Sequence, residues 1–257
     1  MDENETLQAI SKKIANAKRL FVLTGAGLGV ASGLPTFRGP GGVWNGKRPE
    51  DMSSTTGFKR DPIGVWDWYN MRIARYKEAI PNAGHHAITA LQVMIPNLTI
   101  VTQNVDGLQA RSGAKNIIEL HGSIFDLKCT GVRHKYEGVI RTLDGPFEGN
   151  PNSDQPYKHD GCGGTFRPGV VFFGENLPYK ALADAQHESF HADTIVVIGT
   201  SAQVEPAASL ARIHDSNIVL IEINPEPVLS HRTDLVLAQS AEIVLPKIVD
   251  MVKSYLA

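Results

Sequence analysis

Three polar residues stand just past strand-like segments, where their side chains can reach a bound ligand. Asn104 and Asp106 follow the apolar run 98–102, and His121 follows the run 117–120 and precedes a glycine. Histidine has a reference pKa of about 6.5, so a neutral imidazole can act as a base at physiological pH. The alternative is a structural role, because Asn and Asp are common turn residues and a lone histidine more often caps a turn.

A glycine-rich turn, Gly25-Ala26-Gly27, follows the apolar run 20–24. Glycines let backbone amides approach a pyrophosphate, and the N-terminus of a following helix attracts phosphate. The dehydrogenase fingerprint fails, because Val30 occupies the position of its third glycine and no acidic residue ends a second strand about 20 residues later. The turn therefore predicts a nucleotide site without hydride transfer.

Tyr69 and Arg72 are three residues apart in a helical segment, so their side chains project from one face. A phenolic hydroxyl beside a guanidinium suits a carboxylate, which arginine binds with two parallel hydrogen bonds. The alternative is an amphipathic helix with an ordinary surface arginine and a half-buried tyrosine.

Short apolar runs that alternate with helical patterns must position these residues. Near-continuous β-branched runs are typical of buried parallel strands, and the alternation predicts a doubly wound α/β sheet, Rossmann-like in class. Ligands bind such sheets at the carboxyl ends of the strands, where the polar motifs lie. Strands are expected at 20–24, 98–102, 117–120, 194–198 and 218–223, and helices at 7–17, 64–79 and 182–190.

Two stretches interrupt the alternation, and we expect them to pack together as a smaller inserted lobe. Residues 38–95 are rich in Trp, Gly and Pro and then helical, whereas 127–168 are polar and contain both cysteines. The large lobe would comprise 1–37, 96–126 and 169–257, and the whole chain 1–257 one catalytic domain.

Composition and charge exclude several classes of protein. The chain has 257 residues, is 42% hydrophobic and carries a net charge of −2, which predicts a globular enzyme without a direct nucleic-acid or membrane partner. The N-terminus resembles neither a signal nor a transit peptide, so a cytoplasmic monomer is expected, with the nucleus as the alternative. Two cysteines exclude a disulfide framework.

Six motifs occur in the order found in sirtuins, and the chain resembles that family from about Leu20 to Pro246. They are TGAGLGVASGLPTFRGPGGVW, TQNVDGL, ELHGS, GGTFRPGVVFFGENLP, VIGTSAQVEPAA and EIN. The resemblance implies a Rossmann-like domain, a small zinc-bearing lobe, and NAD and an acyl-lysine protein or peptide in the cleft between them. It also implies a reaction in which the acyl oxygen attacks the nicotinamide ribose, yielding nicotinamide, O-acyl-ADP-ribose and free lysine.

The resemblance also implies roles for individual residues. His121 matches the general base, and Asn104 and Asp106 complete the expected catalytic set. The residues expected to bind NAD are Gly25, Ala26, Gly27, Pro35, Phe37, Arg38, Trp44, Gln103, Asn104, Val105, Asp106, Gly199, Thr200, Ser201, Asn224, Pro225, Glu226 and Ala241. Those expected to bind the acyl-lysine substrate are Tyr69, Arg72, Val170, Val171, Phe172, Phe173, Gly174 and Glu175, the last six as a segment that pairs with the substrate backbone.

Tyr-x-x-Arg ahead of PNAGH is the pattern of sirtuins that remove succinyl, malonyl or glutaryl groups. The resemblance therefore implies an acidic acyl group. Acetyl-lysine would be the poorer substrate, because it leaves the arginine without an anionic partner.

The chain departs from the family pattern at its metal site. Sirtuins usually hold structural zinc with two C-x-x-C pairs, but Val132 and His159 stand at two of the four positions. Imidazole is an accepted zinc ligand, so Cys129, His134, His159 and Cys162 form one candidate site. Loss of the metal is the alternative.

The chain departs from the sirtuin motifs at two further positions, and two alternative functions remain. Gly29 replaces a usual serine and Gln109 a usual histidine, without deleting the expected catalytic residues. Mono-ADP-ribosyl transfer to protein would share the first half of the chemistry. A non-catalytic NAD or acyl-lysine binding module is the third hypothesis, against which the intact His121, Asn104 and Asp106 argue.

Overall fold

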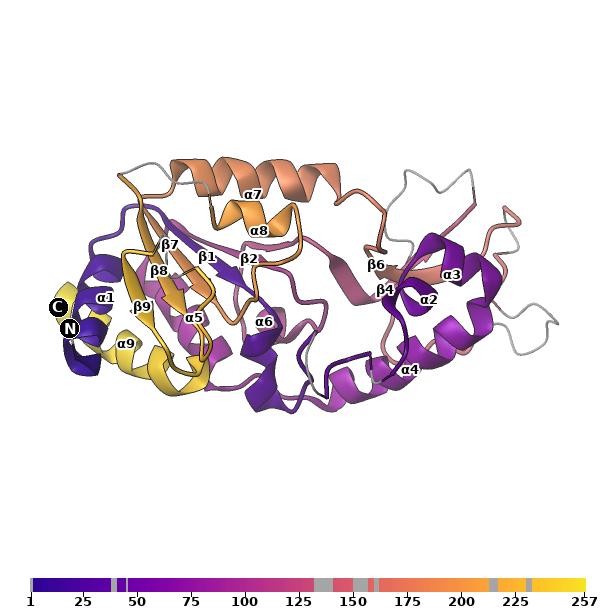
Figure 1. Cartoon of the computed structure of the whole chain (residues 1–257), viewed down its shortest axis with the longest axis horizontal. Coiled ribbons are helices and arrows are strands. Elements are labelled where there is room, and N and C mark those ends of the chain that lie inside the picture. Colours follow the sequence, from indigo (N-terminus) through magenta and orange to yellow (C-terminus); the bar gives the residue numbers. More distant parts are fainter. Residues whose placement is uncertain are drawn as a thin grey trace.

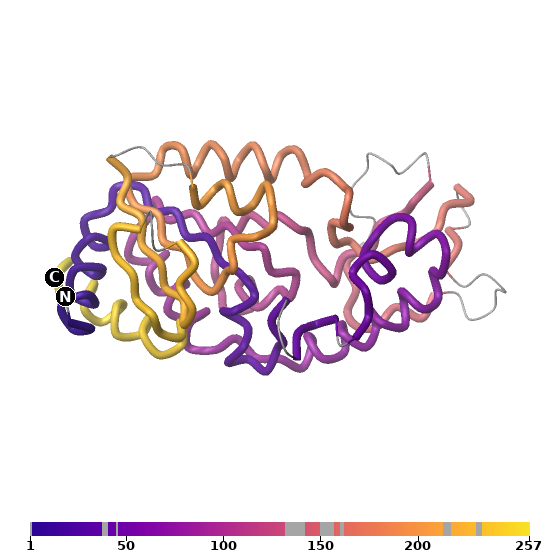
Figure 2. The backbone as a smooth tube through the Cα atoms, in the orientation of Figure 1, coloured from indigo at the N-terminus to yellow at the C-terminus, as the bar shows by residue number. Residues whose placement is uncertain are grey.

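The computed structural model describes residues 2–37, 41–44, 46–131, 141–149, 157–159, 162–212, 217–229 and 233–257. The molecule is elongated, with a sheet lobe at one end and a smaller lobe at the other (Figure 1). Both termini lie at the end of the sheet lobe that faces away from the smaller lobe (Figure 2).

Six parallel strands form the large sheet in the order β3-β2-β1-β7-β8-β9. All five expected strands are present, two of them one residue shorter. Strand β9 was not expected, because a run of three residues is too short to show a strand pattern. Their bounds are β1 Leu20–Thr24, β2 Leu98–Thr102, β3 Ile117–Glu119, β7 Thr194–Ile198, β8 Val219–Ile223 and β9 Leu235–Leu237. The order reverses between β1 and β7, where doubly wound sheets open their ligand crevice.

Helices cover both faces of this sheet, which is why β1 and β7 are buried at every residue. Helices α1 (Glu3–Ala15), α5 (Ala83–Met94) and α9 (Ala241–Leu256) share a core with Leu20 and Val22 of β1. On the opposite face α7 (Tyr179–His191) and α8 (Ala207–Leu210) share one with Phe21 and Leu23 (Figure 1). This alternation along one strand follows from the two-residue period of a β-strand. The expected doubly wound sheet is confirmed.

The expected helices are present, with their ends shifted. Helix α1 begins at Glu3 because Asp2 caps it in a capping box with Glu5. Helix α4 spans Pro62–Glu78, and α7 is longer than expected at its N-terminal end. No helix in the described part of the chain is long and apolar enough to cross a membrane.

The smaller lobe packs three helices against an antiparallel sheet of order β5-β4-β6. Its elements are α2 Pro49–Met52, α3 Thr55–Arg60, α4, β4 Gly122–Cys129, β5 Arg141–Thr142 and β6 Phe166–Val170. One core joins Trp66 and Ile73 of α4 to Leu127 of β4 and Phe147. Residues of both inserted stretches thus meet in this core. Helix α5, however, packs in the core of the large lobe, so packing moves the expected boundary from residue 95 to about residue 82.

Candidate active site

A cavity of about 430 Å³ lies at the carboxyl ends of β1, β2 and β7 and is lined from both lobes. Its wall contains all the expected catalytic and substrate residues and most of the expected NAD residues. Pro225 does not line it, and Ala241 is buried at the start of α9. Arg38 lies outside the described residues. Sequence reasoning missed other lining residues, among them Ser53 and Tyr76.

The glycine-rich turn brings the ends of β1 and β7 into backbone contact. Gly25 N donates to Ile198 O at 3.0 Å and Gly27 N to Gly199 O at 2.8 Å. A Cβ on Gly27 would lie 2.8 Å from Gly199 Cα, and Gly199 has a φ of +58°, so neither position tolerates a side chain. The amides of Gly25 and Gly27 thus hold the strand ends together, while the turn itself lines the cavity. The helix that follows it, Ala26–Ser32, is a 3-10 helix.

His121 is held so that one ring nitrogen points away from its anchor. Its Nδ1 lies 3.0 Å from the carbonyl oxygen of Gln103, which can only accept, so Nδ1 carries the proton. Nε2 is therefore the nitrogen left to take up a proton from a ligand. Burial lowers the pKa of His121, partly offset by the Gln103 hydrogen bond, and this favours the neutral, basic form.

Amide side chains link the ends of three strands around the cavity. Asn104 Nδ2 donates to Gly25 O at 2.9 Å, and Gln103 Nε2 donates to Thr200 Oγ1 at 3.0 Å. Asn224 Nδ2 donates to Thr200 O at 3.0 Å. These bonds fix the amide orientations, so each carbonyl oxygen of the three side chains can face a ligand.

Asp106 is a nearly buried carboxyl at the same edge, with 7% of its surface exposed. Its Oδ1 accepts from Leu108 N at 2.8 Å. Burial raises the pKa of Asp106, while that amide and the charges of Arg111 and Arg72 oppose the rise. A Cβ on Gly29 would lie 3.6 Å from Asp106 Oδ2, so the glycine leaves this oxygen without the hydroxyl that a serine would supply.

Arg72 lies in an aromatic cage at the small-lobe end of the cavity. Its Cζ is 4.5 Å from the ring centre of Trp68, 5.2 Å from that of Tyr76 and 5.4 Å from that of Tyr69. Nη2 donates to Tyr76 Oη at 2.9 Å, whereas the buried Nε has no hydrogen-bond partner in the described structure. Tyr69, expected to bind a carboxylate with Arg72, hydrogen-bonds Ser53 Oγ at 3.1 Å.

The cage continues into an aromatic wall shared with the loop after β1. Trp68 stacks on Trp44 at 5.3 Å between ring centres and 11° between planes. Trp44 in turn contacts Phe37 edge-on at 5.1 Å and Phe173 at 6.1 Å. The expected NAD loop, acyl pocket and substrate segment therefore share one apolar surface.

The substrate segment 170–175 is fixed by its own backbone amides. Val171 N donates to His121 O at 2.9 Å, Phe172 N to Glu175 Oε2 at 2.9 Å, and Phe173 N to Ser53 O at 2.7 Å. Since these three donors are used internally, they are not available to a substrate backbone.

Arg167, which sequence reasoning did not single out, supports that segment from behind. It is 8% exposed, donates to Val170 O at 2.6 Å, forms an ion pair with Glu175, and lies 3.8 Å from the ring centre of Phe172. Burial alone would raise the pKa of Glu175, but the hydrogen bond and charge of Arg167 lower it overall. Arg167 therefore keeps Glu175 ionised and holds the turn that follows β6.

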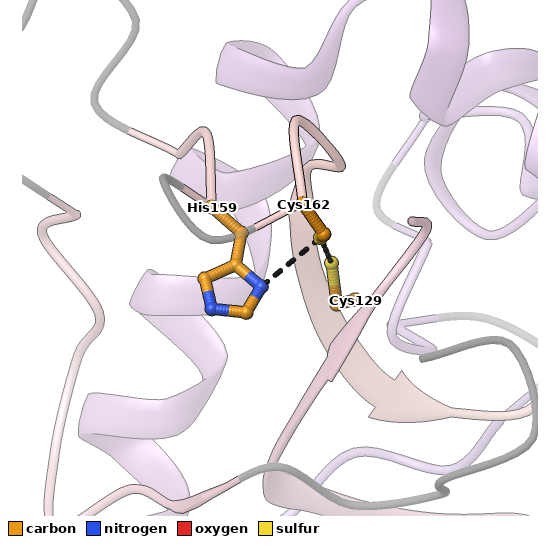
Figure 3. A group of neighbouring side chains, drawn as sticks. All are labelled: Cys129, His159 and Cys162. Atoms are coloured by element: carbon orange, nitrogen blue, oxygen red, sulfur yellow. Dashed lines mark hydrogen bonds between the residues drawn. The ribbon is translucent and has the colours of Figure 1, made fainter. Parts of the chain in front are cut away.

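Three of the four expected metal ligands converge at the far end of the smaller lobe. The ligand atoms of Cys129, His159 and Cys162 all lie within 4.8 Å of one another (Figure 3). The two Sγ atoms are 3.5 Å apart, and His159 Nδ1 is 3.2 Å from Cys162 Sγ. The amides of Gly131 and Gly164 point at the two sulfurs, at 3.3 and 3.4 Å, and such bonds stabilise a thiolate.

A second, smaller cavity behind Asn104 and Asp106 is lined by two titratable residues, the buried His85 and the half-buried Glu119. Burial, with a smaller contribution from the charge of the neighbouring histidine, lowers the pKa of His85 to about 4. Burial, with the charges of Asp126 and Asp106, raises the pKa of Glu119 to about 7. Near neutral pH His85 is therefore uncharged, whereas Glu119 is close to the midpoint of its titration.

Residues 25–206 match the sequence profile of the Sir2 family. The chain is 40% identical over 252 residues to NAD-dependent protein deacylase 1 of Archaeoglobus fulgidus, covering 97% of this chain and 99% of the relative. It is 39% identical over 237 residues to the NAD-dependent protein deacylase of Aquifex aeolicus, covering 91% and 95%. The chain belongs to the Sir2 family, and the resemblance carried by its motifs is confirmed.

Solved structures agree with this assignment. A mutant Sir2 homologue in complex with ADP-ribose has a TM-score of 0.87 and 39% identity, covering 100% of this chain and 98% of the other. A Sir2 homologue–NAD complex has a TM-score of 0.86 and 39% identity, covering 100% and 96%. A Sir2 protein bound to a myristoylated histone peptide has a TM-score of 0.73 and 29% identity, covering 98% of each chain.

His85 and Glu119 should affect the pH dependence of stability in opposite directions. Between pH 6.5 and about 4 only the unfolded chain protonates His85, so stability falls as the pH falls. Between pH 4.5 and about 7 only the folded chain keeps Glu119 protonated, so stability falls as the pH rises. In the wild type the two slopes largely cancel.

Denaturant unfolding of Glu119→Gln and His85→Gln across this pH range tests the pair. Relative to wild type, the free energy of unfolding should rise with pH in Glu119→Gln and fall with pH in His85→Gln. Each change should amount to at most about 3.5 kcal/mol, from about 1.4 kcal/mol per pKa unit over shifts from 6.5 to about 4 and from 4.5 to about 7. Identical slopes in both variants and the wild type would contradict the assignment.

Proposed function

We propose that this chain is an NAD-dependent protein-lysine deacylase whose acyl pocket takes chains that end in a carboxylate, such as succinyl, malonyl or glutaryl. The observation that carries the acyl preference is the caged guanidinium of Arg72. NAD and the acyl-lysine peptide are co-substrates, and the products are nicotinamide, free lysine and O-acyl-ADP-ribose.

His121 supplies the general base of this reaction. The carbonyl of Gln103 fixes the ring so that Nε2 is the accepting nitrogen, and burial lowers the pKa of His121, which favours the unprotonated form. In the reaction that the family relation implies, Nε2 takes the proton from the ribose hydroxyls, which allows transfer of the acyl group to the ribose. The fixed amide oxygens of Asn104 and Gln103, with Asp106, orient the nicotinamide end of NAD.

The electrostatics of Arg72 argue for an anionic acyl group. In the described residues no carboxylate forms an ion pair with Arg72, and its Nε is buried without a partner. Arg72 is half-buried, and withdrawing part of a guanidinium from water without an anion is costly, which aromatic faces offset only in part. A carboxylate that enters the cavity can bond Nε and an Nη nitrogen together, which satisfies the group. An acetyl methyl group cannot.

A long apolar acyl group is the competing substrate. It is favoured by the apolar wall of Trp44, Trp68 and Phe173, and a related Sir2 protein has been solved with a myristoylated peptide. The guanidinium decides between the two, because an alkyl chain beside Arg72 would bury its charge still further without a partner.

We also propose that the thiolates of Cys129 and Cys162 and the imidazole of His159 hold a structural zinc ion. The donor set suits zinc, and the glycine amides that point at both sulfurs stabilise the deprotonated form that the metal requires. Zinc at this site would stabilise the smaller lobe and take no part in catalysis. His134, the expected fourth ligand, lies outside the described residues.

Replacement of Arg72 tests the acyl preference. The wild type should turn over succinyl-lysine peptide faster than acetyl or myristoyl peptide of the same sequence. Arg72→Met should lose about 2–3 kcal/mol of transition-state binding for succinyl, roughly 30- to 150-fold in kcat/KM, and little for acetyl.

Tyr76→Phe is the matched control, because it removes one hydrogen bond to Arg72 but keeps the aromatic cage. It should lower succinyl turnover far less than Arg72→Met does. A wild type that prefers acetyl or myristoyl peptide, or an Arg72→Met enzyme that loses both activities equally, would rule out the acidic pocket while leaving the deacylase intact.

Replacement of His121 tests the general base. His121→Ala should lower deacylation about 10²- to 10⁴-fold, measured by mass spectrometry of peptide and O-acyl-ADP-ribose. Because burial lowers the pKa of His121, the acid limb of the wild-type kcat/KM profile should fall below pH 6.5. An unchanged deacylation rate in His121→Ala would show that His121 is not the general base. ADP-ribose on protein without O-acyl-ADP-ribose would instead indicate ADP-ribosyl transfer.

Metal analysis tests the zinc site. Protein purified without chelator should contain about one zinc per chain, and His159→Gln should contain less and melt at a lower temperature. Chelator should lower the melting temperature of the wild type toward that of the variant. Metal-free wild-type protein that melts at the same temperature with and without added zinc would show that packing alone holds the lobe.

A further inference from the structure

Two histidines stand one helical turn apart on the outer surface of α7, away from the cavity. His187 and His191 are both exposed, the side chain of His187 to 59%. Their ring centres lie 4.3 Å apart, with 39° between the planes. The i, i+4 spacing on a helix thus brings the two imidazoles side by side.

Hydrogen bonds orient both rings by their Nδ1 atoms, so that Nε2 of each ring is available to a ligand. His191 Nδ1 lies 2.8 Å from the carbonyl oxygen of His187, which can only accept, so His191 Nδ1 carries the proton. His187 Nδ1 lies 3.3 Å from Glu188 Oε1, a carboxylate that also acts as an acceptor. Nε2 of each ring therefore holds the free lone pair in the neutral form. Histidines that bind metals almost always donate their other ring nitrogen to a carbonyl or a carboxylate in this way.

The charge around the pair favours a cation. His191 lies in the last turn of α7, where the free carbonyl groups of the helix give it a partial negative charge. Glu188 adds a carboxylate beside His187, and its other oxygen accepts from Thr99 Oγ1 at 3.2 Å, which fixes the side chain. The carboxylate is therefore held in place before a metal arrives.

We propose that His187 and His191 form a surface binding site for a divalent transition-metal ion, with water completing its coordination. Metal–nitrogen bonds of about 2.0–2.1 Å require two nitrogens about 3 Å apart, within reach of rings already in contact. Affinity should follow Cu²⁺ above Ni²⁺ and Zn²⁺. The hard ions Mg²⁺ and Ca²⁺ should bind poorly, because they prefer oxygen ligands.

The site binds metal without cleaving peptides, although His187 to His191 spell the H-E-x-x-H of zinc proteases. A protease needs a third protein ligand and a glutamate that faces a substrate cleft. Neither histidine lines the cavity, and in the described part of the chain no third His, Cys, Asp or Glu joins them. Glu188 is committed to Thr99 and His187 rather than to a cleft.

Nickel titration of the untagged, full-length chain tests the proposal. The protein is first loaded with Zn²⁺ and gel-filtered, so that the cluster of Cys129, His159 and Cys162 is the same in every sample. Calorimetry should detect one Ni²⁺ site in the wild type, with at least tenfold weaker binding in His187→Gln and in His191→Gln. Glutamine keeps the helix, since its helix propensity is higher than that of histidine.

His86→Gln is the control, because His86 is exposed on a different helix and has no histidine one turn away. It should bind Ni²⁺ like the wild type. Added Ni²⁺ should also raise the melting temperature of the wild type and of His86→Gln, but not of the two α7 variants. Unchanged affinity in the α7 variants, or an equal loss in His86→Gln, would overturn the site.

Discussion

The contact between the ends of β1 and β7 determines where everything else in the cavity lies. These are the strands between which the sheet order reverses, so the chain leaves them toward opposite faces and a crevice opens. Gly27 and Gly199 let the two strand ends touch, with no room for a Cβ on either. Asn104, Gln103 and Thr200 then hydrogen-bond across the joined ends, which places His121 and Asp106 on one rim.

The opposite rim depends on aromatic stacking. Trp68 lies between Arg72 and Trp44, so the cation of the proposed acyl pocket and the segment that contains Trp44 share one ring system. Phe173 extends that surface to the segment expected to pair with the substrate backbone. If Arg72 moved, Trp68 alone would transmit the displacement to Trp44. The proposed acyl pocket and the proposed nucleotide loop are for this reason in physical contact, although Arg72 and Trp44 are about 28 residues apart in sequence.

The apolar runs predicted most of the sheet, and the resemblance to sirtuins named most of the residues that line the cavity. Buried strands such as Leu20–Thr24 are continuous apolar runs, and each polar motif follows one directly. Contacts between segments that are distant in the chain could not be predicted from the sequence. The bonds of Arg167 to Glu175 and Val170 depend on how β6 ends, and the packing of α5 against α9 depends on tertiary placement. The sequence also could not show that the amides of Gly25 and Gly27 bond to the end of β7, because a G-x-G turn looks the same with or without that contact.

Aromatic contacts connect the proposed zinc cluster to the core of the smaller lobe. His159 stands where a cysteine is usual, and its ring packs on Phe166 at 4.6 Å between ring centres. Phe166 contacts Phe147 at 5.6 Å, and Phe147 contacts Trp66 at 4.9 Å, deep in the core of the smaller lobe. An imidazole can thus bind metal on one side and extend an aromatic stack on the other, which a thiolate cannot do. Because packing and coordination then act through the same side chain, the lobe can retain its shape with fewer thiolates than the family usually provides.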